Sequence, residues 1–285
     1  MFHFMKITRT ILLASAFGFF LASCNKIDAP YYTVKGGGGD TTKITRKVLL
    51  EDYTGHKCPN CPEAAITAHT LEETYNGKVI VMAVHAGYFA DSSATGDFTA
   101  NYKTSAGDEW NSYFPIISYP SGLVNRKAFQ GSVIIGNDLW AEAVDSIVNL
   151  PADAIIQITN TYNTSTRQLN MTVDSKFLNE LLGKYNLTIC ILEDSIISPQ
   201  KNSNPNIGPT PIIYDYVFMH MLRGSLNGTW GDELTSLIDT SLIYSKTYST
   251  ILNPIWIPKN CSVLAFISNT ETKEIIQAEE KPIIQ

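Results

Sequence analysis

Two cysteines separated by two residues form the part of the sequence best suited to chemistry. Cys58 and Cys61 follow His56 and Lys57, whose side chains add positive potential when protonated. A pair with this spacing can interconvert between a dithiol and a disulfide, with the thiolate as the attacking species. Residues 61–75 have apolar side chains at helical spacing, so the pair stands at the N-terminus of a predicted helix. Helix dipole and free N–H groups favour a thiolate there.

The segments around the pair predict a strand–helix–strand unit. Residues 46–53 and 79–85 are apolar runs of the kind found in strands buried in a parallel sheet. The helix between them makes this a βαβ unit, whose crossover is almost always right-handed. Two further helices are predicted at about 106–113 and 138–150.

This arrangement resembles the redox motif of thioredoxin-like proteins. Asp52 lies six residues before Cys58, and Pro120 follows a tyrosine and precedes a short strand. The resemblance implies that Cys58 is an exposed nucleophile and that Cys61 resolves the mixed disulfide. It also implies that Asp52 shuttles a proton and that the peptide bond before Pro120, a cis-proline in the family, pairs with an extended substrate. The long gap before Pro120 implies an insertion at about 87–105.

Two other interpretations of the cysteine pair remain open. Exported proteins retain disulfides, so a bond between Cys58 and Cys61 could be a purely structural staple. Alternatively, His56 and His85 could join the two cysteines at one edge of the sheet, because parallel strands end on the same side. Four such ligands would suit zinc or copper.

The residue pattern of the second half of the chain predicts an all-β domain. Pro151 marks the change, and alternating apolar and polar residues then predict about seven short strands, the pattern of a β-sandwich. These strands are 154–162, 169–173, 187–192, 216–222, 242–250, 262–268 and 273–279. Cys190 and Cys261 could form a disulfide across the sandwich or remain as buried thiols.

The N-terminus has the features of an export signal. Two basic residues precede an uncharged apolar run at 11–21, which closes on the letters LASC at Cys24. This ending resembles the lipobox of bacterial lipoproteins, which implies removal of residues 1–23 and lipid attachment to Cys24. Residues 24–43 contain four consecutive glycines and are predicted to be a flexible tether.

Composition and motifs exclude several function classes. The chain has 285 residues, 44% of them hydrophobic, and a formal net charge of −6 without a basic cluster. This argues against binding to nucleic acid. No Walker loop, G-x-S-x-G, H-E-x-x-H or EF-hand pattern occurs, so we predict no cofactor and no metal ion. His220 and Arg223 are assigned a core or hydrogen-bonding role rather than a catalytic one.

Three stretches together resemble a known family: EDYTGHKCPNCP at 51–62, NLTICILED at 186–194 with a later Gln200, and HMLRGSLNGTWG at 220–231. They are similar to the Omp-twenty-eight-related outer-membrane lipoproteins of Bacteroidetes. The resemblance implies an α/β thioredoxin-like domain at 44–150, followed by an all-β immunoglobulin-like sandwich at 151–285. It also implies outer-membrane anchoring, often with surface exposure, and supplies no settled activity.

Two functions are therefore expected. The first is an outer-membrane-anchored binding or accessory lipoprotein, facing the cell surface rather than the periplasm, with a structural or vestigial disulfide. Its partner would be an unknown protein or surface ligand, and its lipid would hold it to the membrane. The alternative is a thiol–disulfide oxidoreductase using Cys58 and Cys61. Four aromatic residues could form a contact surface or belong to the core: Tyr88, Phe89, Trp110 and Tyr119.

Overall fold

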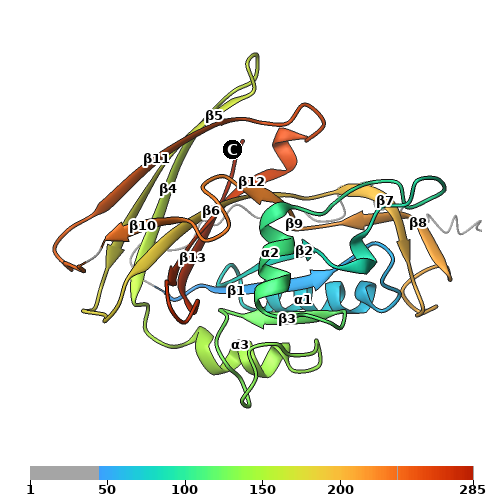
Figure 1. Ribbon diagram of the computed structural model, residues 1–285, viewed down its shortest axis with the longest axis horizontal. Helices are drawn as coiled ribbons and strands as arrows, with labels where there is room; N and C mark the ends of the chain where they lie inside the picture. Colours follow the sequence, from blue (N-terminus) through green and yellow to red (C-terminus); the bar gives the residue numbers. More distant parts are fainter. Residues whose placement is uncertain (1–44, 236, 285) are drawn as a thin grey trace, which may run out of the picture. The chain divides into compact units, whose positions relative to one another are not determined.

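One mixed sheet runs through both halves of the chain and organises the other elements (Figure 1). The computed structural model describes residues 45–235 and 237–284, all of which belong to one compact unit. The predicted signal at 1–23, Cys24 and the tether at 24–43 lie outside the described residues. In the part of the chain that is described, no helix is long and apolar enough to cross a membrane.

The first half alternates strands and helices: β1 (Val48–Thr54), α1 (Cys61–Thr74), β2 (Val79–His85), η1 (Tyr88–Ala90), α2 (Ser105–Tyr113), β3 (Ser121–Val124) and α3 (Trp140–Val148). The second half is built from strands: β4 (Ala154–Asn163), β5 (Gln168–Phe177), β6 (Tyr185–Glu193), β7 (Ile196–Lys201), β8 (Ile212–Phe218), β9 (Met221–Ser225), β10 (Asp232–Thr235), β11 (Tyr244–Ile251), the short helix η2 (Pro258–Asn260), β12 (Cys261–Asn269) and β13 (Ile275–Pro282).

Local sequence explains where the helices begin and end. α1 has Pro62 in its first turn, where a missing N–H costs no helical hydrogen bond. It ends before Asn76 and Gly77, which adopt left-handed φ angles of 46° and 80°. α2 is capped by the Thr104 hydroxyl, which accepts a hydrogen bond of 3.0 Å from the Gly107 N–H.

The large sheet joins strands from both sides of residue 150. Its order is β13-β12-β6-β9-β2-β1-β3, with β10 also paired to β6. β1 and β2 are parallel, which confirms the predicted strand–helix–strand unit. β9 lies on the other side of β2, parallel to it, and is antiparallel to β6. The chain is thus β-rich, as predicted, while its assignment to thioredoxin-like and immunoglobulin-like domains stays a prediction.

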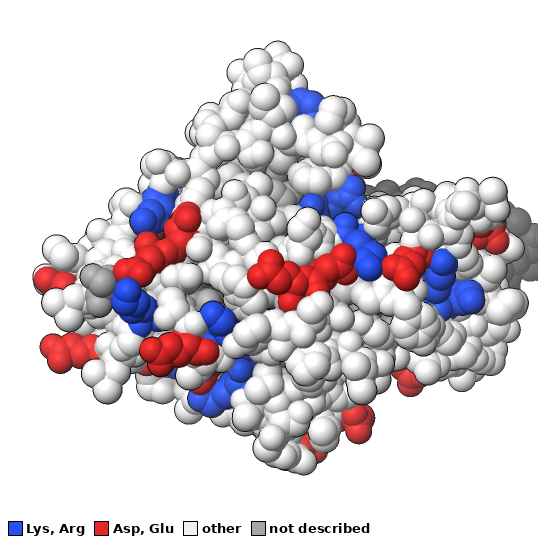
Figure 2. Space-filling view, in the orientation of Figure 1, with Lys and Arg blue, Asp and Glu red and all other residues white. Residues whose placement is uncertain are grey.

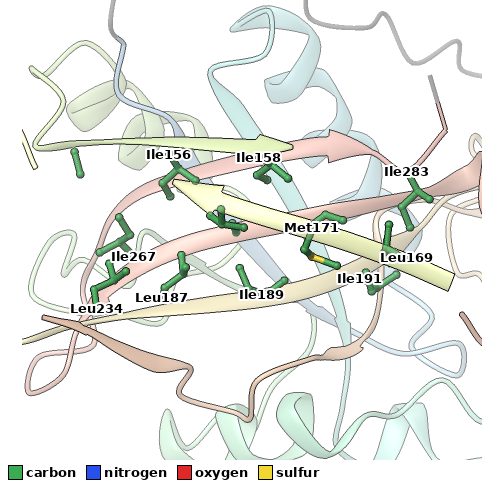
Figure 3. Close-up of a cluster of buried hydrophobic side chains, with 14 of the residues drawn as sticks. Ile156, Ile158, Leu169, Met171, Leu187, Ile189, Ile191, Leu234, Ile267 and Ile283 are labelled. Atoms are coloured by element: carbon green, nitrogen blue, oxygen red, sulfur yellow. The ribbon is translucent and has the colours of Figure 1, made fainter. Parts of the chain in front are cut away.

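Strands β6 and β12 serve two cores at once. Their alternate side chains point to opposite faces of the sheet. One face packs against the three-stranded sheet β11-β5-β4 (Figure 3), where Ile156 and Met171 lie over Leu187 and Ile189. The other face belongs to the core that includes α2 and its Trp110. A third core, under α1 and α3, covers the opposite face of β1 and β2.

The prediction of one strand over 216–222 is wrong. β8 ends at Phe218 and β9 begins at Met221. His220 between them has a φ of 54°, a left-handed conformation that a continuous strand does not accommodate. β8 instead pairs with β7 as a separate two-stranded hairpin.

Cys190 and Cys261 do not pair with each other. Both are buried free thiols, which leaves the second of the two predicted alternatives. Cys190, on β6, belongs to the core that includes α2, whereas Cys261, on β12, belongs to the sandwich core on the other face. Because the two side chains lie on opposite faces of the sheet, they cannot meet.

A buried ion pair lies on one face of the large sheet, in the core that includes α2. The Arg126 Nε and Nη2 atoms donate to the two carboxylate oxygens of Glu51 at 2.7 and 2.8 Å. Both side chains are at most 1% exposed. The guanidinium also lies 5.0–5.8 Å from four aromatic ring centres, those of Trp110, Phe114, Trp230 and Phe266. Bidentate hydrogen bonds and cation–π contacts together compensate the desolvated charge.

We expect Arg126→Met to lower the free energy of unfolding by about 3–5 kcal/mol, since it leaves the Glu51 carboxylate buried without its partner. Combining it with Glu51→Leu should recover most of the loss, because both charges are then removed. Urea denaturation of the single and double variants measures both effects. A loss below about 1 kcal/mol in Arg126→Met would show that the pair contributes little.

Candidate functional site

The two cysteines of the CxxC pair form a disulfide at the N-terminus of α1, directly after β1. Cys58 is fully buried and Cys61 is 2% exposed. The resemblance to thioredoxin-like proteins implied an exposed nucleophile at Cys58, and the structure differs on this point. The difference arises because two other segments of the same chain cover the loop that carries the disulfide.

The β7–β8 hairpin covers one side of this loop. The Lys201 N–H donates to the His56 carbonyl at 2.8 Å, and the Ser203 N–H donates to the Pro59 carbonyl at 2.9 Å. The Ser203 hydroxyl adds a bond of 2.7 Å to the Asn60 side-chain oxygen. The hairpin therefore meets the CxxC loop much as a neighbouring strand would.

Gln200 anchors the hairpin from inside. Its side chain is 1% exposed, and its amide nitrogen donates to the Cys58 carbonyl at 2.7 Å and to the Lys201 carbonyl at 2.9 Å. Gln200 belongs to the sequence pattern of the family resemblance, but its contact with the disulfide loop could not be inferred from that pattern. A buried amide with its donors satisfied fixes the hairpin in one position.

The segment predicted as an insertion covers the other side. The Phe89 carbonyl accepts a bond of 3.0 Å from the Lys57 N–H. This chain passes so close to Gly55 that a Cβ there would lie 2.5 Å from the Phe89 carbonyl carbon. Further along the same segment, Phe98 stacks on His56 with ring centres 5.4 Å apart. Glycine at position 55 is thus required by the close approach of two backbones.

A small cavity of about 30 Å³ adjoins Cys61, and Asp52, His85 and Phe218 of β8 also line it. This volume is sufficient for water. Within the described residues, Asp52 Oδ1 and both ring nitrogens of His85 are buried without a hydrogen-bond partner. The structure therefore brings Asp52 and Cys61 to one cavity, while the predicted role of Asp52 as a proton shuttle stays a prediction.

Burial controls the protonation of these groups. It raises the pKa of Asp52 to about 7, with the nearby positive charge of His220 acting in the opposite direction. It lowers the pKa of His85 to about 3, helped by His56 and Arg223. Burial also lowers the pKa of His56. The two histidines are thus neutral at pH 7, and Asp52 is divided between its two forms.

The four residues considered as a zinc or copper site do not assemble one. Cys58 and Cys61 are bonded to each other, whereas metal coordination requires thiolates. The ring of His85 instead packs against Tyr102 and Phe218, with ring centres 5.4 and 5.3 Å away.

Pro120 lies at the same edge of the sheet as the disulfide. The Tyr119–Pro120 peptide bond is cis, and the next residue, Ser121, pairs with Tyr53 near the end of β1. Of the four aromatic residues considered as a contact surface, Tyr88 is the one that is largely exposed, at 63%, whereas Trp110 is fully buried.

The raised pKa of Asp52 makes a prediction about stability. Its carboxyl has a pKa of about 7 in the folded chain against an ordinary value of 3.8, so folding favours the protonated form. Stability is then highest below about pH 4 and falls as the pH rises to about 7. Three pKa units correspond to about 4 kcal/mol.

We expect Asp52→Asn to remove this fall, so that the variant becomes more stable than the original protein above pH 7. Urea unfolding measured from pH 4 to pH 8 tests this, with the exposed Asp97→Asn as the matched control. Parallel stability curves for the Asp52 variant and the original protein would contradict it.

Comparison with known proteins identifies solved structures with a similar fold and a matching family. The structure matches HBP35 of Porphyromonas gingivalis with a TM-score of 0.59 and 19% identity, over 85% of this chain and 76% of that one. It also matches protein AGR_C_4864 from Agrobacterium tumefaciens with a TM-score of 0.53 and 12% identity, over 85% and 97% of the two chains. These likenesses concern the fold alone. No curated protein matches the sequence.

A domain of the outer membrane lipoprotein Omp28 from Porphyromonas gingivalis also matches, at 23% identity over 46% of this chain and 88% of that one, with a TM-score of 0.32. The family model described as outer membrane protein Omp28 matches residues 107–284, more than half of the chain. The protein therefore belongs to the Omp28 family of outer membrane proteins.

Proposed function

We propose that this protein is a lipid-anchored lipoprotein of the outer membrane, exposed at the cell surface, that acts as a binding or accessory protein. In this proposal the disulfide is a structural element. The structural role of the disulfide rests on the complete burial of Cys58 beneath the protein's own β7–β8 hairpin. The membrane location rests on the family and on the lipobox-like sequence at Cys24.

Exchange with a client protein requires a thiolate to reach one sulfur of the disulfide. Here that approach would require the hairpin to leave the CxxC loop. The movement would break the backbone bonds of Lys201 and Ser203 and expose the buried amide of Gln200. Each broken bond costs about 0.5–1.5 kcal/mol in net terms, and an unsatisfied buried group costs more. This free-energy cost favours a structural disulfide over a site of thiol–disulfide exchange.

We also propose an assignment of the fold to two known types of domain. We assign β1, α1, β2 and β3 to a thioredoxin-like unit, supported by the CxxC pair at the helix N-terminus and by Pro120 at the start of the antiparallel strand β3. We assign the two facing sheets of the second half to an immunoglobulin-like sandwich. They are β11-β5-β4 on one side and β6, β12 and β13 on the other.

The partner is proposed to be a protein or surface ligand rather than nucleic acid. On the face shown in Figure 2, acidic and basic side chains are interspersed and no broad basic surface is present. Binding to phosphate backbones depends on such a surface.

A second candidate function is favoured by one observation. Asp52, with its pKa raised to about 7, lies at the same cavity as Cys61. A carboxyl group with this pKa can take or give a proton near neutral pH, as a resolving cysteine requires. The oxidoreductase function therefore remains the alternative, and it requires an opened hairpin.

The reduction potential of the disulfide separates the two functions. We expect a value below about −300 mV, the range of structural disulfides, for the full chain carrying Cys24→Ser. Alkylation of thiols across a graded redox buffer measures it. A value between about −120 and −270 mV would support the oxidoreductase instead.

Gln200→Ala in the same background should speed reduction by thiols about tenfold or more, because it removes buried bonds that hold the hairpin on the loop. The matched control is Asn206→Ala, on an exposed residue of the β7–β8 connection. Equal rates in the two variants would show that the hairpin does not protect the disulfide.

The proposed anchor makes a separate prediction. We expect Cys24→Ser to move the protein from the membrane fraction to the soluble fraction, because several acyl chains are lost at roughly 0.8 kcal/mol per buried CH₂. Cell fractionation measures this, with Ser23→Ala as the control that keeps a small residue before the cysteine. Retention of the Cys24 variant in the membrane would contradict lipid anchoring, and protease treatment of intact cells reports the exposed face.

A further inference from the structure

We propose that His69, Glu72 and His220 form a binding site for a divalent transition metal ion of the zinc class. His69 and Glu72 lie three residues apart on α1, so they share one face of the helix. His220 reaches the same place from the turn between β8 and β9. One ligand atom from each residue lies within 4.8 Å of the other two. This site is independent of the proposed function.

The two separations that involve Glu72 suit tetrahedral coordination. Glu72 Oε2 lies 3.5 Å from His69 Nδ1 and 3.3 Å from His220 Nε2. Zinc binds imidazole nitrogen and carboxylate oxygen at about 2.0–2.2 Å, which places neighbouring tetrahedral ligands about 3.4 Å apart. The two measured separations lie on either side of that value. Two imidazoles with one carboxylate suit zinc, copper or nickel better than magnesium or calcium.

His220 and Glu72 form an ion pair, with 3.3 Å between His220 Nε2 and Glu72 Oε2. The Nε2 atom is buried, and it meets Glu72 Oε2 without the angles of a well-aligned hydrogen bond. Two ligands of one zinc ion would have a similar separation, so the pair could bind an ion with little rearrangement.

Each histidine also has a carboxylate beside its second ring nitrogen. His220 Nδ1 lies 3.6 Å from Asp194 Oδ1, and His69 Nε2 lies 3.4 Å from Glu73 Oε1. Metal-binding histidines almost always have such an outer partner, which orients the ring and strengthens the ligand. Both rings thus present one nitrogen to Glu72 and the other to a second carboxylate.

Two hydrogen bonds fix the backbone of His220. Its N–H donates to Asp194 Oδ1 at 2.6 Å, and its carbonyl accepts a bond of 2.8 Å from the Ala83 N–H. These bonds hold the residue at its φ of 54°, a conformation that non-glycine residues seldom adopt. Strained backbone held by surrounding contacts is concentrated at functional sites.

The site is partly exposed to solvent. The side chains of His69, Glu72 and His220 are 21%, 29% and 11% exposed. An ion held by these three residues would keep a coordination position toward solvent, filled by water or by a group from a partner. Three protein ligands with one open position is the arrangement of zinc sites that bind an exchangeable ligand.

Zinc binding to the full chain, freed of metal by a chelator, tests the proposal. We expect uptake of one zinc ion by isothermal titration, and a tetrahedral absorption spectrum when cobalt replaces zinc. His69→Ala and Glu72→Gln should each weaken zinc binding at least tenfold. The matched control is Glu63→Gln, which removes an exposed carboxylate from the first turn of the same helix and should leave binding unchanged.

His220→Asn provides the second arm, because asparagine tolerates a left-handed backbone and lacks the imidazole. It should also weaken zinc binding at least tenfold. The His69→Ala result decides the question if the His220 variant does not fold, since position 69 lies on the helix surface. Absence of zinc uptake, or unchanged affinity in His69→Ala, would overturn the proposal and leave the three residues as an ion-pair cluster.

Discussion

The buried ion pair between Glu51 and Arg126 imposes a packing constraint that both halves of the chain satisfy together. Glu51 lies in β1 and Arg126 just after β3, yet the rings around the guanidinium include Trp230 and Phe266 from the second half. A charge of this kind is tolerated only when its partner and its surroundings are complete. The strands on both sides of residue 150 must therefore pack as one structure before the pair is stabilised.

The order of the strands then dictates what covers the disulfide. β6 and β9 are antiparallel neighbours. Glu193 at the end of β6 lies opposite Met221 at the start of β9, at the edge of the sheet where these strand ends meet. The chain between these residues must leave and re-enter the sheet at this edge, and it does so as the β7–β8 hairpin. Because β9 also lies beside β2, the hairpin emerges where β1 and β2 end. The CxxC loop follows β1 at that edge, so Cys58 is buried as a consequence of sheet order.

Local patterns in the sequence predict local elements well, and they fail where distant residues decide. The apolar run at 79–85 has the observed bounds of β2, and the CxxC pair stands at the start of α1 as expected. β7 escapes prediction because it is short, contains Pro199 and forms only in pairing with β8. The burial of Cys58 depends on Gln200, 142 positions away, and spacing near the cysteines carries no information about that contact.

Asp194 and His220 mark the two places where the β7–β8 hairpin leaves and re-enters the large sheet, and we call this base of the hairpin its neck. The His220 N–H donates a hydrogen bond to Asp194 that joins the two sides of the neck. Glu72 of α1, the helix that begins with the disulfide, lies 3.3 Å from His220. An ion bound by His69, Glu72 and His220 would tie the neck to that helix. The cover over the disulfide would then be held at both ends, by Gln200 at the CxxC loop and by the metal at the neck.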